Sequence, residues 1–279
     1  MALIPEKDWI KKIVKLEKES RKSTKKKVEK ALVNAIQKRI PKEKFGILLS
    51  GGVDSCFIAF ICKKAKADFI CYTVGLDNSP DIPWAMSFAK RFRIPIKVKT
   101  FSLDEVHELF KEAKKALEHV DILSIGVGSV ILAAMKMAKK DGIKTVFSGL
   151  GSEEIFAGYH HHAKAKDVHA ECWARLKTMW KRDMRRDNSI ASSLGMEIVA
   201  PFLDDDLIRE GMGIPPKRKI SEEEKKIILR EIAEGLGLPK KYAWRSKKAA
   251  QYGSWFDKAM FKLTKRKGFK KKDDYLRSL

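Results

Sequence analysis

The sequence lacks the features of a secreted, disulfide-bonded or membrane-spanning protein. Its four cysteines form no CxxC pair, which argues against a zinc site and against a disulfide framework. The N-terminus has no apolar run of signal-peptide length, and no stretch approaches the roughly 18 uninterrupted apolar residues of a membrane span. We therefore expect a cytoplasmic protein with reduced, buried cysteines and no membrane association.

Acidic residues are too few to balance the basic ones. The 279 residues include 36 Asp and Glu against 59 Lys and Arg, so the net charge is +23. One explanation is a surface built for nucleic acid or another polyanion, and the other is the Lys and Glu enrichment of proteins that work at high temperature. The second explains the many Glu residues but leaves the imbalance itself unexplained.

Short apolar runs alternate with helical patterns in the first half of the chain. The pattern predicts an amphipathic helix over 5–26 and a second helix that stops at Pro41. Alternation beyond that point predicts a doubly wound parallel α/β sheet, with ligands held at the carboxyl ends of its strands. The expected strands are 45–49, 69–75, 94–100 and 143–148, and the expected helices lie near 56–66, 82–92, 103–117 and 128–140.

The second half shows only helical patterns beyond about residue 164, with no further convincing strand. It predicts a C-terminal helical lobe that covers the strand ends. The sequence from about Lys262 is so basic that we expect a solvated, partly frayed end. The expected organisation is a charged N-terminal helix (1–27), an α/β core (28–164), a helical lobe (165–262) and a basic tail (263–279).

The strongest chemical signal is the hexapeptide SGGVDS at 50–55, between the first strand and its helix. Paired glycines let the backbone approach a phosphate, while successive N–H groups and the helix N-terminus supply partial positive charge. Its two serines add hydroxyl donors, and the acid between them suits a magnesium–phosphate complex. The segment lacks the lysine and the spacing of a Walker loop. It predicts an anion-binding loop of another kind.

This hexapeptide resembles the pyrophosphate-binding loop of the N-type ATP pyrophosphatases. That superfamily includes GMP, NAD, argininosuccinate and asparagine synthetases and several tRNA-modifying enzymes. A second segment, SGLGSEE at 148–154 followed by Phe156, Gly158 and Tyr159, is similar to the SGEGSDE-x-F-x-GY segment of asparagine synthetases. Three more segments agree in order and spacing: GL with SPD (75–81), DxxR with PFLD (183–204), and LR with WRSK (229–247).

The match runs from about residue 28 to 260 and implies a fold, two cofactors and a set of roles. The implied fold is adenine nucleotide alpha hydrolase-like (HUP-type), with an ATP pyrophosphatase core at 28–164 and a synthetase lobe at 165–262. ATP and Mg²⁺ would be the cofactors. Fixed cations and N–H groups near the transferring phosphoryl group would lower the barrier. The resemblance places Leu48, Val74 and Gly149 at the adenine, Ser50, Gly51, Gly52, Asp54, Ser55 and Ser148 at the phosphates, Asp54 and Glu153 at Mg²⁺, and Lys247, Arg186 and Asp183 in catalysis.

Several departures from the family pattern bear on the substrate. Leu150 stands where the family has an acid that suits proton handling, and leucine lacks that capacity. The family's arginine five residues after the acid matching Asp121 falls on Gly126, which weakens charge pairing with a substrate carboxylate or pyrophosphate. Aspartate as substrate is therefore in doubt. Only about 27 residues precede the match, and residue 2 is Ala, so we expect no glutamine hydrolysis here. Nitrogen would come from ammonia, a separate glutaminase subunit or another amine.

The leading hypothesis is an asparagine-synthetase-like, AMP-forming carbon–nitrogen ligase of amino-acid biosynthesis. It would act on a small-molecule carboxylate. One rival is a tRNA-modifying ATP pyrophosphatase that uses the basic surface to bind RNA, and another is a nucleotide-binding protein that has lost turnover. Whether the chain forms a homodimer stays open.

Two polar clusters have weaker interpretations. Adjacent histidines on a regular element diverge, so His160, His161 and His162 indicate a polar loop beside the nucleotide more than a metal site. Glu118, His119 and Asp121 match positions that line the family's substrate pocket, and a helix C-terminal cap explains them nearly as well.

Overall fold

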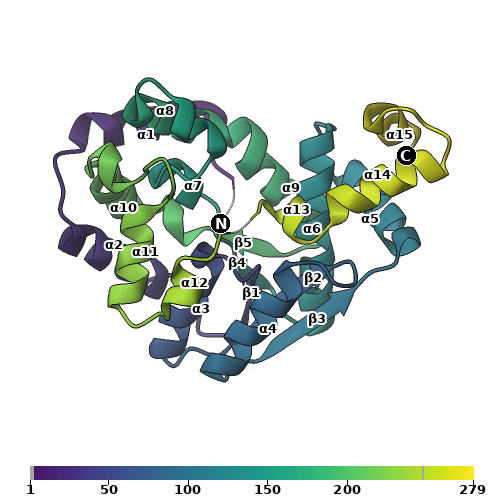
Figure 1. The fold of residues 1–279 in the computed structure, drawn as a ribbon, viewed down its shortest axis with the longest axis horizontal. Helices are drawn as coiled ribbons and strands as arrows, with labels where there is room; N and C mark the ends of the chain where they lie inside the picture. Colours follow the sequence, from purple (N-terminus) through teal and green to yellow (C-terminus); the bar gives the residue numbers. More distant parts are fainter. Residues whose placement is uncertain (1–2, 247) are drawn as a thin grey trace.

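Five parallel strands form the central sheet of the computed structural model, which describes residues 3–246 and 248–279 (Figure 1). Their order is β3-β2-β1-β4-β5, so the chain starts in the middle, moves to one edge and returns to build the other. This is a doubly wound sheet with its switch point between β1 and β4, which confirms the predicted fold class. The strands are β1 (Phe45–Leu48), β2 (Phe69–Gly75), β3 (Ile96–Thr100), β4 (Thr145–Phe147) and β5 (Glu197–Val199).

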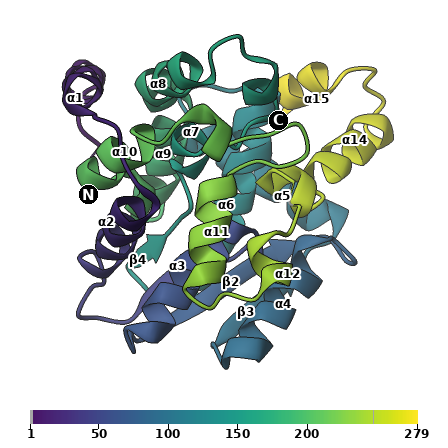
Figure 2. The ribbon, with the colours of Figure 1, turned by 60° about the vertical axis from the view of Figure 1, so that its left-hand side comes forward.

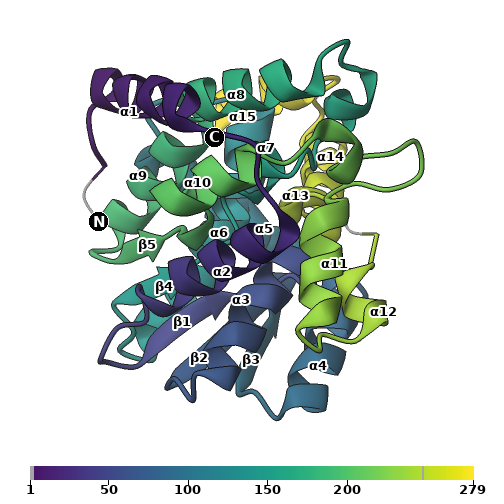
Figure 3. The same ribbon diagram turned by 90° about the vertical axis from the view of Figure 1, so that its left-hand side faces the viewer.

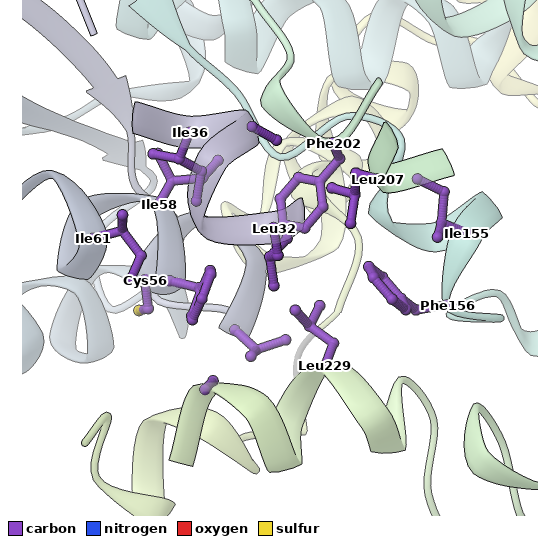
Figure 4. Packing of buried hydrophobic residues seen from close by; sticks show 14 of the residues in the cluster. Leu32, Ile36, Cys56, Ile58, Ile61, Ile155, Phe156, Phe202, Leu207 and Leu229 are labelled. Atoms are coloured by element: carbon purple, nitrogen blue, oxygen red, sulfur yellow. The ribbon is translucent and has the colours of Figure 1, made fainter. Parts of the chain in front are cut away.

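Helices cover both faces of the sheet. On one face α3 and α4 pack against the strands and α2 lies over α3, as Figure 3 shows. The apolar side chains of α2, α3, α10 and α11 meet there, among them Leu32, Ile58, Leu207 and Leu229 (Figure 4). This layer comprises α2 (Lys25–Gln37), α3 (Val53–Lys64), α4 (Asp81–Phe92), α10 (Asp205–Met212), α11 (Ile227–Gly235) and α12 (Lys240–Ala243).

The opposite face is covered by a helix that is apolar nearly all round. Helix α6 packs against β1 and β2 and is flanked by α5, α9 and α14. It is long and apolar enough to cross a membrane, but 61% of its most apolar window is buried inside the protein, so it is a core helix of the α/β layer. The helices on this side are α5 (Leu103–Ala116), α6 (Ile122–Lys140), α9 (Arg185–Ser193), α13 (Ala250–Gly253), α14 (Phe256–Arg266) and α15 (Lys272–Ser278).

Short elements connect these layers near the strand ends. Trp9 of α1 donates its indole N–H to the Leu176 carbonyl of α8 at 2.8 Å, which fixes the N-terminal helix on the lobe. The remaining elements are α1 (Glu6–Glu19), α7 (Ser152–Ile155), η1 (His160–Lys164), α8 (Val168–Met179), the π-helical turn η2 (Trp180–Met184), and the 3₁₀ turns η3 (Pro201–Leu203) and η4 (Pro216–Arg218).

The structure corrects the prediction at both ends of the chain. The helix expected over 5–26 ends at Glu19, and a new helix begins at Lys25 because the Thr24 side chain caps it; residue 27 therefore lies within α2. The tail is not frayed: α15 buries Tyr275, whose hydroxyl lies 2.7 Å from His107 Nδ1. The helices at the two ends, α1 and α15, lie on opposite sides of the molecule (Figure 2).

The prediction of no strand after residue 164 is also wrong. Strand β5 pairs in parallel with β4, with Val146 opposite Ile198. At three residues it is too short to carry an alternating pattern, and it forms because the β4 edge offers open backbone groups. Pairing here continues past the strand itself, since Ser148 N donates to the Val199 carbonyl at 2.9 Å.

Candidate functional site

A cavity of about 620 Å³ opens at the carboxyl ends of β1, β2 and β4. Its floor consists of the residues that follow these strands, and its walls come from α6, from the η1 to α9 stretch and from the segment at 249–254. The position is the switch point of the sheet, where open α/β folds bind their ligands. The sequence predicts thirteen site residues, of which the structure describes twelve. Ten of these line the cavity: Leu48, Ser50, Asp54, Ser55, Val74, Ser148, Gly149, Glu153, Asp183 and Arg186.

The hexapeptide forms a loop that turns directly into α3. Gly51 has φ +73°, and a Cβ there would lie 2.8 Å from Trp84 Cβ and from an Arg245 nitrogen, so only glycine fits. Ser50 N donates to Ser55 Oγ at 3.2 Å, and Gly52 N donates to Ser50 Oγ at 3.3 Å. These bonds fold the loop around the α3 N-terminus, which supplies the partial positive charge that an anion requires.

Lys226 joins the two predicted loops, and sequence reasoning missed it. Its buried ammonium lies 2.8 Å from Asp54 Oδ1, 2.8 Å from Glu153 Oε1 and 3.0 Å from Ser152 Oγ. Burial alone would lower the pKa of Lys226, but the two carboxylates raise it above its ordinary value. Its φ of +56° is a costly conformation for a non-glycine residue, and these contacts hold it there. In the run EEEKK nothing local marks this lysine; its position three residues before the LR pair is the only signal.

Residues of the matched motifs far along the chain support the phosphate loop through hydrogen bonds. Arg245 donates to the Ser50 carbonyl at 2.7 Å and to Asp81 Oδ1 at 2.7 Å. Arg230 in turn donates to the carbonyls of Ala243 and Arg245 at 2.7 and 3.1 Å. The residues that resemble the family's later motifs thus form one hydrogen-bonded brace that holds the phosphate loop from the side of α4 and α11.

Four buried or half-buried charges lie along the cavity wall formed by η2 and α9. Asp183 accepts from Arg182 at 2.8 Å and from Arg186 at 3.0 Å, and Arg186 also donates to Asp187 at 2.8 Å. Burial raises the pKa of Asp187 to about 6, although the charge of Arg186 opposes that rise. A π-helical turn carries Asp183, and such turns recur at functional sites.

The second loop brings an acid with an unusual pKa behind the cavity wall. Tyr159, which lines the cavity, donates to Glu154 Oε1 at 2.6 Å. Burial, followed by the charge of Asp183, raises the pKa of Glu154 to about 7. The second carboxylate oxygen of Glu154 has no partner among the described residues. The pair Tyr159 and Glu154 therefore has the chemistry of a proton acceptor near neutral pH.

The apolar part of the cavity is a slot between the strand ends and α6. Leu48 and Val74 face it from β1 and β2, opposite Val130, Ile131 and Ala134 of α6. At Gly149 a Cβ would approach Asp54 Cβ to 2.9 Å, so glycine lets the two loops close on each other. A flat apolar group such as a purine suits this slot, whereas its role in binding adenine stays a prediction.

The structure changes two other predictions. Asp121 is an N-terminal cap, because its carboxylate accepts from Ser124 N at 2.7 Å. Helix α6 therefore begins at Ile122 and not near residue 128, so the glycines at 126 and 128 lie inside it. Asp54 lies in the first turn of α3 and is 4% exposed, so it is not a loop residue. Lys247 lies outside the described residues.

The prediction that the adjacent histidines diverge is wrong for two of them, because the His161 and His162 ring centroids lie 4.7 Å apart on the short 3₁₀ turn η1. His161 lies 3.4 Å from Glu171 and reaches the cavity, while His162 is fully buried and accepts from Tyr159 N at 3.2 Å. Burial lowers the pKa of His162 to about 4, so its ring stays neutral. The part of the chain that the structure describes contains no group of three or more His, Cys, Asp or Glu arranged for a metal.

The predicted Mg²⁺ ligands nevertheless come together. Asp54 and Glu153 both contact the one Lys226 ammonium, which brings two carboxylates to one point beside the phosphate loop. Mg²⁺ in nucleotide sites usually takes one or two protein carboxylates and completes its shell with water and phosphate oxygens. This donor set fits that pattern, and the ion's binding here stays a prediction.

The fold and this site define a doubly wound α/β protein with an anion-binding loop, buried charges and an apolar slot at the switch point. The asparagine synthase family model matches residues 27–167 and 160–276. The chain belongs to the asparagine synthase family. This confirms the resemblance that the motifs indicate.

Its similarity to individual proteins agrees with the family match. It is 33% identical to a putative glutamine-hydrolyzing asparagine synthetase from Methanocaldococcus jannaschii, over 88% of this chain and 52% of that protein. It is 32% identical to asparagine synthetase B from Escherichia coli, over 76% of this chain and 42% of that protein. Among solved structures, NMN synthetase from Francisella tularensis aligns over 82% of this chain and 77% of that one, with TM-score 0.46 and 13% identity. The chain spans about half the length of the curated relatives it matches.

Proposed function

We propose that this chain is an AMP-forming carbon–nitrogen ligase that adenylates a small carboxylic acid and passes the acyl group to ammonia or an amine. A carboxylate oxygen attacks the α-phosphorus of ATP, the bond from that phosphorus to the β-phosphate oxygen breaks, and pyrophosphate leaves. The nitrogen then attacks the acyl carbon, the carbon–oxygen bond to AMP breaks, and one proton leaves the nitrogen. Each step transfers one group and balances without an oxidant or reductant.

The observation that carries the proposal is the junction of the two loops at Lys226. Asp54 of the phosphate loop, Glu153 of the second loop and the buried ammonium meet within 2.8 Å contacts at the cavity floor. A fixed charge cluster at this point suits a triphosphate that must lose its terminal pyrophosphate, because catalysis of phosphoryl transfer is mostly positioning and charge neutralisation. Family membership supports the same chemistry.

The chain's own residues supply most of what such a reaction needs. Loop N–H groups and the Ser50 and Ser55 hydroxyls would hold phosphate oxygens, and Arg186 would add positive charge on the α9 side. Mg²⁺, when bound at Asp54 and Glu153, would supply charge neutralisation on the phosphates. We assign Glu154 as the base that accepts the proton released by the nitrogen, by way of the Tyr159 hydroxyl. Leu150 cannot take this role because leucine has no ionisable group.

The nitrogen source belongs to the same proposal. Ammonia, an amine or ammonia delivered by a separate glutaminase subunit would all arrive as a neutral nucleophile at the acyl carbon. A separate glutaminase would act as a partner, and its absence from an assay is overcome by adding ammonium. Ammonium is therefore included in each assay that tests the function.

Pyrophosphate release from ATP and Mg²⁺, measured with purified protein, tests this function. We expect release that depends on a carboxylic acid and yields AMP in equal amount, with the amide formed when ammonium is present. Release that requires tRNA and no free carboxylate would assign the chain to RNA modification. ATP binding without release under either condition would show a nucleotide-binding protein without turnover.

A further inference from the structure

One wall of the cavity differs in character from the charged floor. Leu123 and Val127 lie four residues apart on α6 and both line the cavity, next to the strand-end slot. Leu150, on the second loop, adds another apolar side chain where the related enzymes have an acid. Burying an uncharged ligand group against such an apolar wall is favourable, whereas burying a charged group there costs free energy.

One polar group on this wall is an uncharged amide. Gln251 of α13 is 4% exposed and lines the cavity, and its side-chain oxygen has no hydrogen-bond partner among the described residues. A Cβ added at Gly126 would lie 3.4 Å from Gln251 Cβ, in ordinary contact. The Cβ and Cγ of Gln251 therefore lie beside the bare backbone of Gly126, the position at which the related enzymes are expected to place an arginine.

The arginines that line the cavity are already paired with carboxylates of this chain. Arg175 contacts Glu171 at 2.8 Å, and Arg182 contacts Asp183 at 2.8 Å. Arg186 contacts both Asp183 and Asp187. A second carboxylate on the substrate would have to share one of these guanidinium groups with its present partner or lie beside Leu123 and Val127, and either choice carries a charge-desolvation cost.

We infer that the acceptor is a monocarboxylic acid whose side chain is uncharged and mainly apolar, selected by Gly126, Gln251, Leu123 and Val127. This inference rests on the proposed function and specifies its substrate. Aspartate carries a second carboxylate that this wall does not pair. The buried Gln251 amide would instead contact a neutral polar group of the acceptor, such as a hydroxyl.

A matched set of acceptors separates this inference from the function itself. In 3-hydroxybutanoate a methyl group replaces the carboxylate next to the amine of aspartate and a hydroxyl replaces the amine, whereas in 3-methylbutanoate methyl groups replace both. With ATP, Mg²⁺ and ammonium, we expect pyrophosphate release with kcat/KM at least about tenfold higher for the neutral acids than for aspartate, which is the size of one lost charged contact.

Variants at the wall give a second measurement. Gly126→Arg places a cation at the missing position and should shift the preference toward aspartate by about tenfold or more, whereas Gly126→Ala adds only the Cβ and should keep the wild-type preference. If Gly126→Arg does not fold by circular dichroism, Gln251→Lys introduces the cation from the facing side, with Gln251→Met as its control.

The outcomes differ for the two proposals. Wild-type kcat/KM for aspartate equal to or above that for the neutral acids overturns the inference and leaves the ligase function standing. So does an unchanged preference in folded cation variants. Failure of every carboxylate to support pyrophosphate release overturns the proposed function, and the inference with it.

Discussion

The two sides of the cavity follow different rules. On the floor, beside the phosphate loop, charges occur in compact pairs: Lys226 with Asp54 and Glu153, and Arg245 with Asp81. On the α6 wall, Leu123, Val127 and the amide of Gln251 face the same space without a charge. Of the floor residues, Asp54, Asp81 and Arg245 belong to segments that match the family's motifs, whereas Gly126 and Leu150 on or near the wall depart from them.

This contrast indicates which part of the site the chemistry of the reaction constrains. Handling a triphosphate requires fixed charges at set distances, because a displaced cation no longer meets the charge that develops during transfer. Selection among acceptors depends on the difference between the protein's affinities for them, and a change of one or two residues can alter that difference. We therefore expect variants of the floor to lose activity outright, and variants of the wall to change preference among acceptors.

The largest effect is expected at Asp54. Asp54→Asn removes a charge from the floor while keeping the size of the side chain, so pyrophosphate release with the best acceptor should fall by about three decades or more. We also expect a loss of thermal stability, because Asp54 is buried and paired. This loss should be small, because Glu153 still pairs with Lys226. Asp77→Asn, at an exposed position, is the matched control. Near-normal release by folded Asp54→Asn would remove the floor from the mechanism.

Lys226 gives the next largest effect, and it is on stability. Lys226→Met removes the ammonium that contacts both carboxylates and should lower the free energy of unfolding by about 3 kcal/mol. The low end of the range for buried pairs applies because Glu153 is partly exposed. Urea unfolding measures the loss, with exposed Lys217→Met as control.

A double variant shows whether the loss comes from charge. Asp54→Asn combined with Lys226→Met should recover part of the lost stability, because one of the two carboxylates that lose the Lys226 ammonium is gone. Strictly additive losses would instead show that Lys226 acts through packing of its stem and not through its ammonium.

The parts of the site that sequence analysis located are those in which local pattern and chemistry coincide. The segment SGGVDS follows an apolar strand and opens a helix, so the sheet topology alone places it at the switch point. The second loop follows β4 for the same reason. Both predictions need only the rule that parallel strands end at one edge.

Other features depend on partners far along the chain. Lys226 is one lysine among many in a charged segment, and only the fold brings it 172 residues back to Asp54. Strand β5 forms because β4 presents an open edge, which three residues of sequence do not reveal. The contact of Gln251 with Gly126 likewise depends on how α13 lies against α6, a matter of tertiary packing that no local pattern contains.

The smallest effect is expected at a third wall of the cavity, formed by η1, where burial keeps the His162 ring neutral. His162 is folded as a neutral ring with its pKa lowered to about 4, against 6.5 for an ordinary histidine. Between those values the unfolded chain binds a proton that the folded protein does not, so stability is lost as pH falls from about 6.5 to about 4. His162→Gln keeps an acceptor for Tyr159 N and has no titrating ring, so it should lose on the order of 2 kcal/mol less stability than wild type over this window. Urea unfolding at pH 7, 5.5 and 4.5 measures the difference, with exposed His160→Gln as control. A wild-type pH profile that His162→Gln leaves unchanged would mean that the ring is protonated in place, and this wall would then carry a charge like the floor.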